Sequence, residues 1–191
     1  EVYYPLADTP SHRDLELVVT DGRTFAERET AATTRRVERL EGRGLTFRQV
    51  NTARSGRSRI TKTYVNDPGR PVVLVDVRFE SLTGRPYRVY LLSDPALGND
   101  GNDDRGRTVG RTLVARDGEL AAALRTEPAL LGTSSGYMGR SDGWRQLRTG
   151  RRLTQAWRAD RAGNVVQVAR TALTGRPGGR SLRLALGFAR S

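Results

Sequence analysis

Apolar and polar residues alternate most regularly in the segment Pro71–Pro95. In its first half every second residue is apolar, which is the period of a β-strand with one buried face. These residues are Val73, Val75, Val77 and Phe79. Turn formers follow at 83–86, and the alternation resumes over Tyr87–Leu92. The pattern predicts a β-hairpin at the centre of a sheet.

Turn signals recur along the rest of the chain at the intervals typical of an all-β protein. They stand at residues 21–22, 54–57, 66–69, 117–118, 162–164 and 175–179. The Asp-Gly pairs at 21–22 and 117–118 favour hairpins because they tolerate positive φ. After the last turn comes the strand with the cleanest apolar face, made by Leu182, Leu184, Leu186 and Phe188.

Helical signals are few. Segments 35–40 and 118–124 are too short for stable helices and have strand-like neighbours, so both are predicted to be strands. In segment 141–147 the hydroxyl of Ser141 can cap a short helical turn. Many antiparallel strands in 191 residues predict an all-β fold, a large antiparallel two-sheet sandwich that forms one domain over residues 1–191.

Composition narrows the function classes. The chain has no cysteine, which excludes disulfides, thiolate metal sites and cysteine nucleophiles but leaves the cellular compartment open. No apolar run approaches the roughly 18 residues of a membrane helix, so no membrane partner is expected. Residues 1–5 lack the basic start and apolar core of a signal peptide.

The net charge of +12 is compatible with a phosphate-binding surface, but Lys62 is the only lysine. An excess made almost wholly of arginine is what a GC-rich genome produces. The densest basic and aromatic segment, Trp144–Arg158, has side chains that stack on bases or on sugar rings. Other arginines fall at alternate strand positions, as an outward polar face would place them, so no nucleic acid is expected. These are Arg48, Arg59, Arg78, Arg88 and Arg183.

Catalytic and metal-binding residue types are scarce. His12 is the only histidine, so the sequence offers little for a His-based triad or for zinc or iron. None of the 21 acidic residues is marked as half of a glycosidase pair, and no catalytic residue is assigned. No cofactor is expected. The loop Asn99–Asp104 is rich in oxygen donors and is the one candidate for calcium, but its spacing is not that of an EF-hand, and an ordinary solvated loop is the first interpretation.

An ordered series of short segments resembles the N-terminal domain of bacterial glucoamylases and glucodextranases. The segments are 1–5, 8–10, 13–15, 19–22, 64–68, 77–80, 97–99, 136–144 and 184–188. The most specific is 136–144, Gly-Tyr followed by Ser-Asp-Gly-Trp. In that family the domain is a β-supersandwich that precedes an (α/α)6 catalytic barrel. The chain departs from the family at 100–105, where a loop rich in glycine and tryptophan is common.

The resemblance implies a noncatalytic domain of an inverting, exo-acting α-glucan hydrolase, whose (α/α)6 barrel would follow residue 191. The family's acid and base are glutamates of that barrel, so the chain alone is expected to be no enzyme. Its expected partner is the barrel, which it would support by contact, and the α-glucan substrate is reached through the parent enzyme. Candidate contact residues are Tyr3, Tyr4, Tyr137, Ser141, Asp142 and Trp144; the alternative for the aromatic residues is that they fill the core.

Two other interpretations stay open. The first is an independent carbohydrate-binding module for α-glucans, with Trp144 or Trp157 as its platform. The second is nonspecific binding of polyanions through dispersed positive charge, which ranks below both other interpretations.

Overall fold

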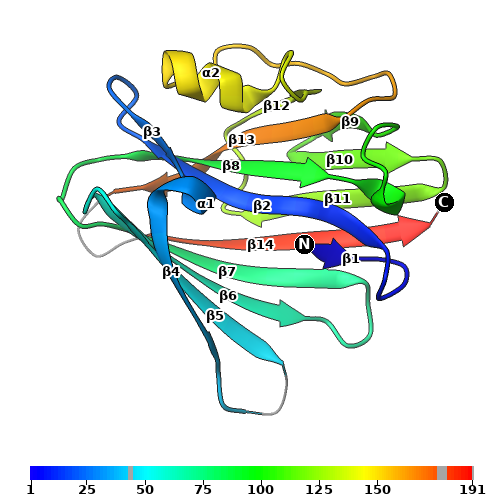
Figure 1. The fold of residues 1–191 in the computed structure, drawn as a ribbon, viewed down its shortest axis with the longest axis horizontal. Coiled ribbons are helices and arrows are strands. Elements are labelled where there is room, and N and C mark those ends of the chain that lie inside the picture. Colours follow the sequence, from blue (N-terminus) through cyan, green and yellow to red (C-terminus); the bar gives the residue numbers. More distant parts are fainter. Residues whose placement is uncertain (43–44, 176–179, 191) are drawn as a thin grey trace.

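A computed structural model describes residues 1–42, 45–175 and 180–190. These residues form two antiparallel sheets that pack face to face (Figure 1). The predicted all-β, two-sheet sandwich is therefore confirmed.

The smaller sheet has six strands within the described residues. Its path is β1 (Val2–Tyr3), β2 (Pro10–Thr20), β8 (Arg88–Pro95), β13 (Val165–Thr174) and β12 (Gly132–Tyr137), and β3 (Ala26–Arg28) pairs with β2 off this path. β1 and β12 thus form the ends of this path.

The larger sheet has eight strands within the same described ranges. Their order is β4 (Thr33–Arg39), β5 (Thr46–Ala53), β6 (Ser58–Asn66), β7 (Val72–Ser81), β14 (Arg180–Arg190), β11 (Leu120–Glu127), β10 (Thr112–Asp117) and β9 (Arg105–Val109). The inward residues of β14, from Leu182 to Phe188, are buried as their alternation predicts. Segments 35–40 and 118–124 are strands β4 and β11 with the turn before β11, which confirms both predictions.

Three short helical segments join the strands in the described residues. The helix α1 (Glu29–Ala32) carries the chain from β3 in one sheet to β4 in the other, and a 3-10 helix spans Leu97–Asn99. The helix α2 (Gly143–Gly150) lies on the outer face of the six-stranded sheet (Figure 1). None of the helices in the described ranges is long and apolar enough to cross a membrane.

Apolar side chains are buried in two layers. The main cluster lies between the sheets and includes Phe79, Leu91 and Leu184. A second cluster, which includes Tyr90 and Leu147, lies between α2 and the outer face of the six-stranded sheet. The six-stranded sheet is therefore covered on both faces where α2 lies.

The hairpin predicted over 71–95 is wrong in its pairing. Both strands form, but β7 pairs with β6 and β14, whereas β8 pairs with β2 and β13 in the other sheet. The cause is burial: seven of the eight residues of β8 are buried, because the main core covers one face and α2 the other. β7 exposes alternate residues such as Asp76 and Arg78 to solvent. Each strand lies in the middle of its own sheet, and the turn between them crosses the sandwich.

Four other predicted turns do join paired strands. They lie between β2 and β3, β5 and β6, β6 and β7, and β10 and β11. Of the last predicted turn, 175–179, only Gly175 is described; residues 176–179 lie outside the described residues.

Candidate functional site

A cavity of about 570 Å³ opens between the two sheets, where β1 and β2 face β6 and β7. Aromatic residues and charged residues line it together. They include Tyr3, Tyr4, His12, Glu16, Glu29, Lys62 and Tyr64. Such a mixture in a cavity is the usual first candidate for a binding site, so the partners of the charged groups decide what it can do.

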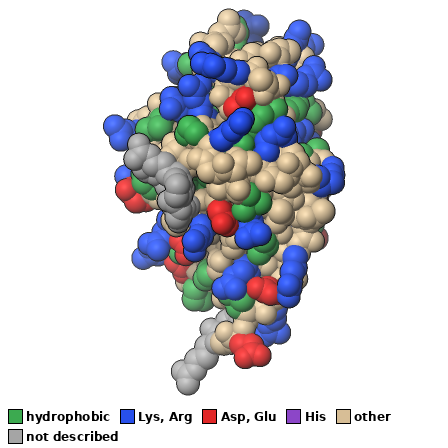
Figure 2. All heavy atoms as spheres, turned by 90° about the vertical axis from the view of Figure 1, so that its left-hand side faces the viewer, with side chains coloured by type: hydrophobic (Ala, Val, Ile, Leu, Met, Phe, Trp, Pro, Cys, Tyr) green, Lys and Arg blue, Asp and Glu red, His purple; other side chains and the backbone are tan. Residues whose placement is uncertain are grey.

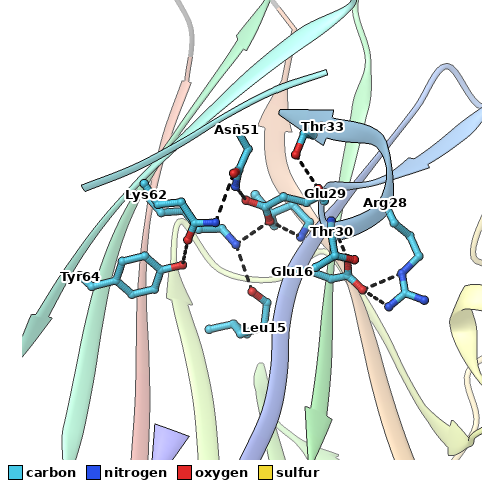
Figure 3. Close-up of polar contacts among 11 residues, drawn as sticks. Leu15, Glu16, Arg28, Glu29, Thr30, Thr33, Asn51, Lys62 and Tyr64 are labelled. Atoms are coloured by element: carbon cyan, nitrogen blue, oxygen red, sulfur yellow. Dashed lines mark hydrogen bonds and ion pairs between the residues drawn. The ribbon is translucent and has the colours of Figure 1, made fainter. Parts of the chain in front are cut away.

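Glu29 and Lys62 form a buried ion pair that ties the two sheets together (Figure 3). Glu29 Oε2 lies 2.5 Å from Lys62 Nζ and accepts from the backbone N–H of Leu17 at 2.9 Å. Lys62 Nζ also donates to the carbonyl of Leu15 at 3.0 Å, and Asn51 donates to the other Glu29 oxygen. Leu15 and Leu17 belong to β2, whereas Asn51 and Lys62 belong to β5 and β6. The network therefore replaces apolar contacts between the sheets at this point.

The sequence contains a signal for this pair that periodicity alone reveals. Along β6 the inward positions are Ile60, Lys62 and Tyr64, between the outward Thr61 and Thr63. A lysine at an inward strand position needs a buried partner. Its partner Glu29 lies in α1, a helix that no local pattern predicted.

A second polar cluster surrounds Glu16 on β2. Glu16 Oε1 accepts from Arg28 Nε at 2.7 Å, and Oε2 accepts from the Thr30 hydroxyl at 2.6 Å. The Arg28 guanidinium lies over the Trp144 ring, 5.4 Å from its centroid, a cation–π contact. This cluster links β2, α1 and α2.

These partners define what the cavity can do chemically. The side chains of Glu16 and Glu29 are only 2% and 1% exposed, and each is bound to a cation. A carboxylate that is buried and bonded in this way cannot reach a glycosidic oxygen of a substrate outside the sandwich. Both glutamates therefore serve the architecture of the sandwich.

His12 also lines the cavity. Its Nε2 lies 2.9 Å from the hydroxyl of Ser93, and burial lowers its pKa to about 3. The imidazole is thus neutral at physiological pH and pairs with a neighbouring strand.

The two N-terminal tyrosines have different environments. Tyr4 stacks on Phe188 with ring centroids 5.4 Å apart and packs against the main core. Tyr3 is 47% exposed, and its hydroxyl donates to Glu1 at 2.7 Å. Of this pair, Tyr3 has the surface that a partner domain requires.

In the segment 136–144, most polar groups bond within the segment. The Tyr137 hydroxyl donates to the carbonyl of Arg161 at 2.9 Å, and Ser141 Oγ accepts from the Tyr137 N–H at 3.1 Å. Asp142 caps α2 by accepting from the Arg145 N–H at 2.6 Å. The predicted cap at Ser141 is wrong by one residue, because the Ser141 hydroxyl closes the turn after β12.

Gly136 and Gly143 of this segment are required by close contacts. A Cβ on Gly136 would lie 1.9 Å from the carbonyl oxygen of Ser141, and one on Gly143 would lie 2.6 Å from Val168 Cβ. The segment therefore folds tightly onto the six-stranded sheet. Since β1 and β12 end opposite sides of that sheet, Tyr3 and Tyr137 are not brought together.

The two tryptophans also differ in how far their rings are exposed. Trp144 is partly buried against the cluster beneath α2, and Arg28 lies over its ring. Trp157 is 44% exposed and lines a shallow surface groove. Of the two predicted sugar platforms, only Trp157 has an open ring.

The loop Asn99–Asp104 contains a buried carboxylate without a hydrogen-bond partner. Asp104 is 0% exposed, and neither of its side-chain oxygens is bonded in the part of the chain that the structure describes. Burial raises the pKa of Asp104 to about 7. The N–H of Leu97 is close enough to oppose the rise although its geometry is not that of a hydrogen bond, and the charges of Asp117, Asp94 and Asp100 add to the rise. No group of three or more histidines or acidic residues in the described ranges is arranged to hold a metal ion.

The basic side chains do not gather into one patch on the face that Figure 2 shows, where acidic side chains lie between them. Three outward arginines of the larger sheet are paired: Arg48 with Glu38 at 3.3 Å, Arg59 with Glu80 at 3.4 Å and Arg183 with Asp76 at 3.0 Å. Charge distributed in this way gives weak, salt-sensitive attraction to polyanions.

Comparisons with known proteins agree on one relationship. A family model described as glucodextranase, domain N, matches residues 1–191. A glucoamylase of Clostridium sp. (strain G0005) is 32% identical over 173 residues, which is 87% of this chain and 24% of that protein. A crystal structure of a bacterial glucoamylase complexed with acarbose matches with a TM-score of 0.88 at 28% identity, over 99% of this chain and 28% of that one. The chain thus spans about a quarter of the length of these relatives.

Proposed function

The chain belongs to the glucodextranase N-domain family, and from this premise we propose that it is a noncatalytic domain of an inverting, exo-acting α-glucan hydrolase. Its role is to support a separate catalytic barrel by direct contact. The observation that carries this proposal is the full-length match to a domain that makes up about a quarter of a glucoamylase. The buried, cation-bound state of Glu16 and Glu29 supports the noncatalytic part.

The exposed aromatic surface suggests where the contact lies. Tyr3 is half exposed, while Tyr137 and Trp144 keep part of their rings accessible at the other edge and on the outer face of the smaller sheet. Large aromatic residues with a polar tip commonly anchor interfaces. Ser141 and Asp142 act behind them by holding the turn and α2 in place.

The purified chain is expected to release no glucose from maltooligosaccharides or dextran, because Glu16 and Glu29, the buried glutamates of its main cavity, are both bound to cations of the sandwich. In the parent enzyme, deletion of residues 1–191 should lower the thermal midpoint of the catalytic part and its glucose release together, since both depend on the lost contact. Turnover by the chain that survives repurification would refute the noncatalytic role. A catalytic part that is equally stable and active without the chain would refute the supporting role.

For the loop Asn99–Asp104 we propose calcium as the ligand. Asp104 supports this with two unpartnered buried oxygens, the donor type that calcium prefers. Backbone carbonyls must complete the set, since no three acidic groups of the described residues converge.

Asp104→Asn is expected to gain up to about 2 kcal/mol of stability relative to the wild type as pH rises from about 5 to about 7.5. Unfolded Asp104 loses its proton near 3.8, whereas folded Asp104 keeps it to about 7, so the wild type loses stability across this window. The titration of His12 changes stability in the opposite direction, because its folded pKa of about 3 lies below the unfolded value of 6.5. Both proteins contain His12, so its effect cancels in the difference between them. Urea unfolding in EDTA measures the difference.

A difference between the two proteins that does not vary with pH would contradict the buried state of Asp104. Calcium is tested in the same assay at the higher pH. Added Ca²⁺ should raise the unfolding midpoint of the wild type but not that of Asp104→Asn. A wild-type midpoint that does not move rules calcium out.

A further inference from the structure

Trp157 lines a groove of about 440 Å³ on the side of the molecule where β9 and β12 lie next to each other. The other main lining residues are Arg107, Thr108, Val109, Thr133 and Arg158. Trp157 and Val109 are 44% and 51% exposed. The groove is shallow and open, a shape that admits one face of an extended chain.

The backbone beneath the indole is fixed without any ligand. The N–H of Trp157 donates to Ser134 Oγ and its carbonyl accepts from the Ser135 N–H, both at 3.0 Å. Two residues later, Ala159 exchanges two hydrogen bonds of 2.9 Å with Gly106 on β9. The segment is therefore tied to an edge strand of each sheet, and a platform held in this way loses little entropy when a ligand binds.

The groups around the indole suit a ring that has an apolar face and a polar rim. The C–H face of a pyranose packs on an indole, and its hydroxyls then meet the surrounding donors and acceptors. The guanidinium groups of Arg107 and Arg158 donate, and the hydroxyls of Thr108 and Thr133, 2.8 Å apart, serve in both ways.

Two observations favour a neutral sugar chain over a polyanion. Arg158 already faces Asp160 at 3.5 Å, which reduces the local positive charge. The family assignment places the chain with enzymes named for glucans. Trp144 offers no equivalent site, because Arg28 and the sheet cover it.

We propose that the Trp157 groove binds an α-glucan chain by stacking a glucose ring on the indole. The choice of glucan rests on the proposed function, but the supporting role and the binding site can be refuted by different results. Loss of support for the catalytic part appears as instability of the parent enzyme, whereas loss of this site appears only as lost binding by the isolated chain.

The test is a fluorescence titration of the chain with maltoheptaose and with soluble starch. Since Trp144 and Trp157 are the only tryptophans, Trp144→Phe leaves Trp157 as the sole reporter, and Trp157→Ala leaves Trp144 as the matched control. A saturable change is expected in the wild type and in Trp144→Phe. Trp157→Ala removes the reporter, so its affinity is measured by isothermal titration calorimetry beside the wild type; it should be weakened at least about tenfold, as the loss of ~1.4 kcal/mol would. Arg107→Ala, which leaves the indole in place, should weaken it severalfold.

An unchanged unfolding midpoint for Trp157→Ala would show that the loss is local. The proposal is overturned if no glucan gives a saturable change, or if Trp157→Ala binds as tightly as the wild type. It is also overturned if the groove responds only to single-stranded DNA, with affinity that collapses between about 50 and about 200 mM salt, because that is polyanion binding.

Discussion

Glu29→Ala is expected to lower the free energy of unfolding by about 3–5 kcal/mol, the cost of leaving one half of a buried ion pair alone. The substitution removes the carboxylate partner of the Lys62 ammonium, whose side chain is 6% exposed. The carbonyl of Leu15 still accepts a hydrogen bond from it. The substitution also leaves the Asn51 amide and the Leu17 N–H without the acceptor that they share. Urea unfolding followed by circular dichroism measures the loss.

Glu80→Ala is the matched control, because Glu80 pairs with Arg59 at 3.4 Å on the surface and both side chains are more than 40% exposed. It should cost at most about 1 kcal/mol. The double variant Glu29→Leu with Lys62→Met should be more stable than Glu29→Ala, since it buries no charge. If Glu29→Ala costs no more than Glu80→Ala, the network does not hold the sheets together.

Gly136→Ala is expected to destabilise the chain by more than about 3 kcal/mol. The new Cβ would lie 1.9 Å from the carbonyl oxygen and 2.5 Å from the carbonyl carbon of Ser141. Both are backbone atoms, so no side-chain rotation relieves the overlap. The turn between β12 and α2 would have to open, which would release the Asp142 cap and lift α2 from the sheet.

Gly132→Ala provides the comparison on the same strand. Gly132 begins β12, and nothing lies within 4 Å of its Cβ position, so the change should stay within about 0.5 kcal/mol. Thermal unfolding and near-UV circular dichroism of the two variants give the measurement. Equal stability of the two variants would mean that segment 136–144 does not pack as described.

This packing bears on the contact with a catalytic domain that we propose for the segment 136–144. The segment and α2 pack on the outer face of the six-stranded sheet. They are held there by the close contacts of Gly136 and Gly143 and by the hydrogen bonds of Ser141 and Asp142. A partner domain that touches Trp144 therefore contacts a surface that is already in place. We expect substitutions behind this surface to act on the contact through stability.

Much of the fold could be predicted from local patterns. The alternation in β7 and β14 gives both strands and their buried faces, and the Asp-Gly pairs mark the β2–β3 and β10–β11 hairpins. These features succeed because side-chain direction in a strand and positive φ in a turn are properties of neighbouring residues. The family resemblance was also readable, since the segments that carry it keep their order along the chain.

The partners of each strand and charge could not be predicted in the same way. The pattern in 71–95 gives two strands but not that they lie in different sheets, because pairing depends on which other surfaces cover β8. The inward position of Lys62 was visible, yet its partner Glu29 comes from a helical turn 33 residues earlier. Likewise, the sequence does not show that Trp144 is partly buried whereas Trp157 is exposed.

Periodicity and residue order were therefore enough to predict the strands, most of their turns, the sandwich class and the family. Only the folded chain shows which strands share a sheet, that Glu29 and Lys62 meet between the sheets, and that Trp157 is open while Arg28 covers Trp144. These features depend on burial, and burial depends on surfaces that distant segments form together.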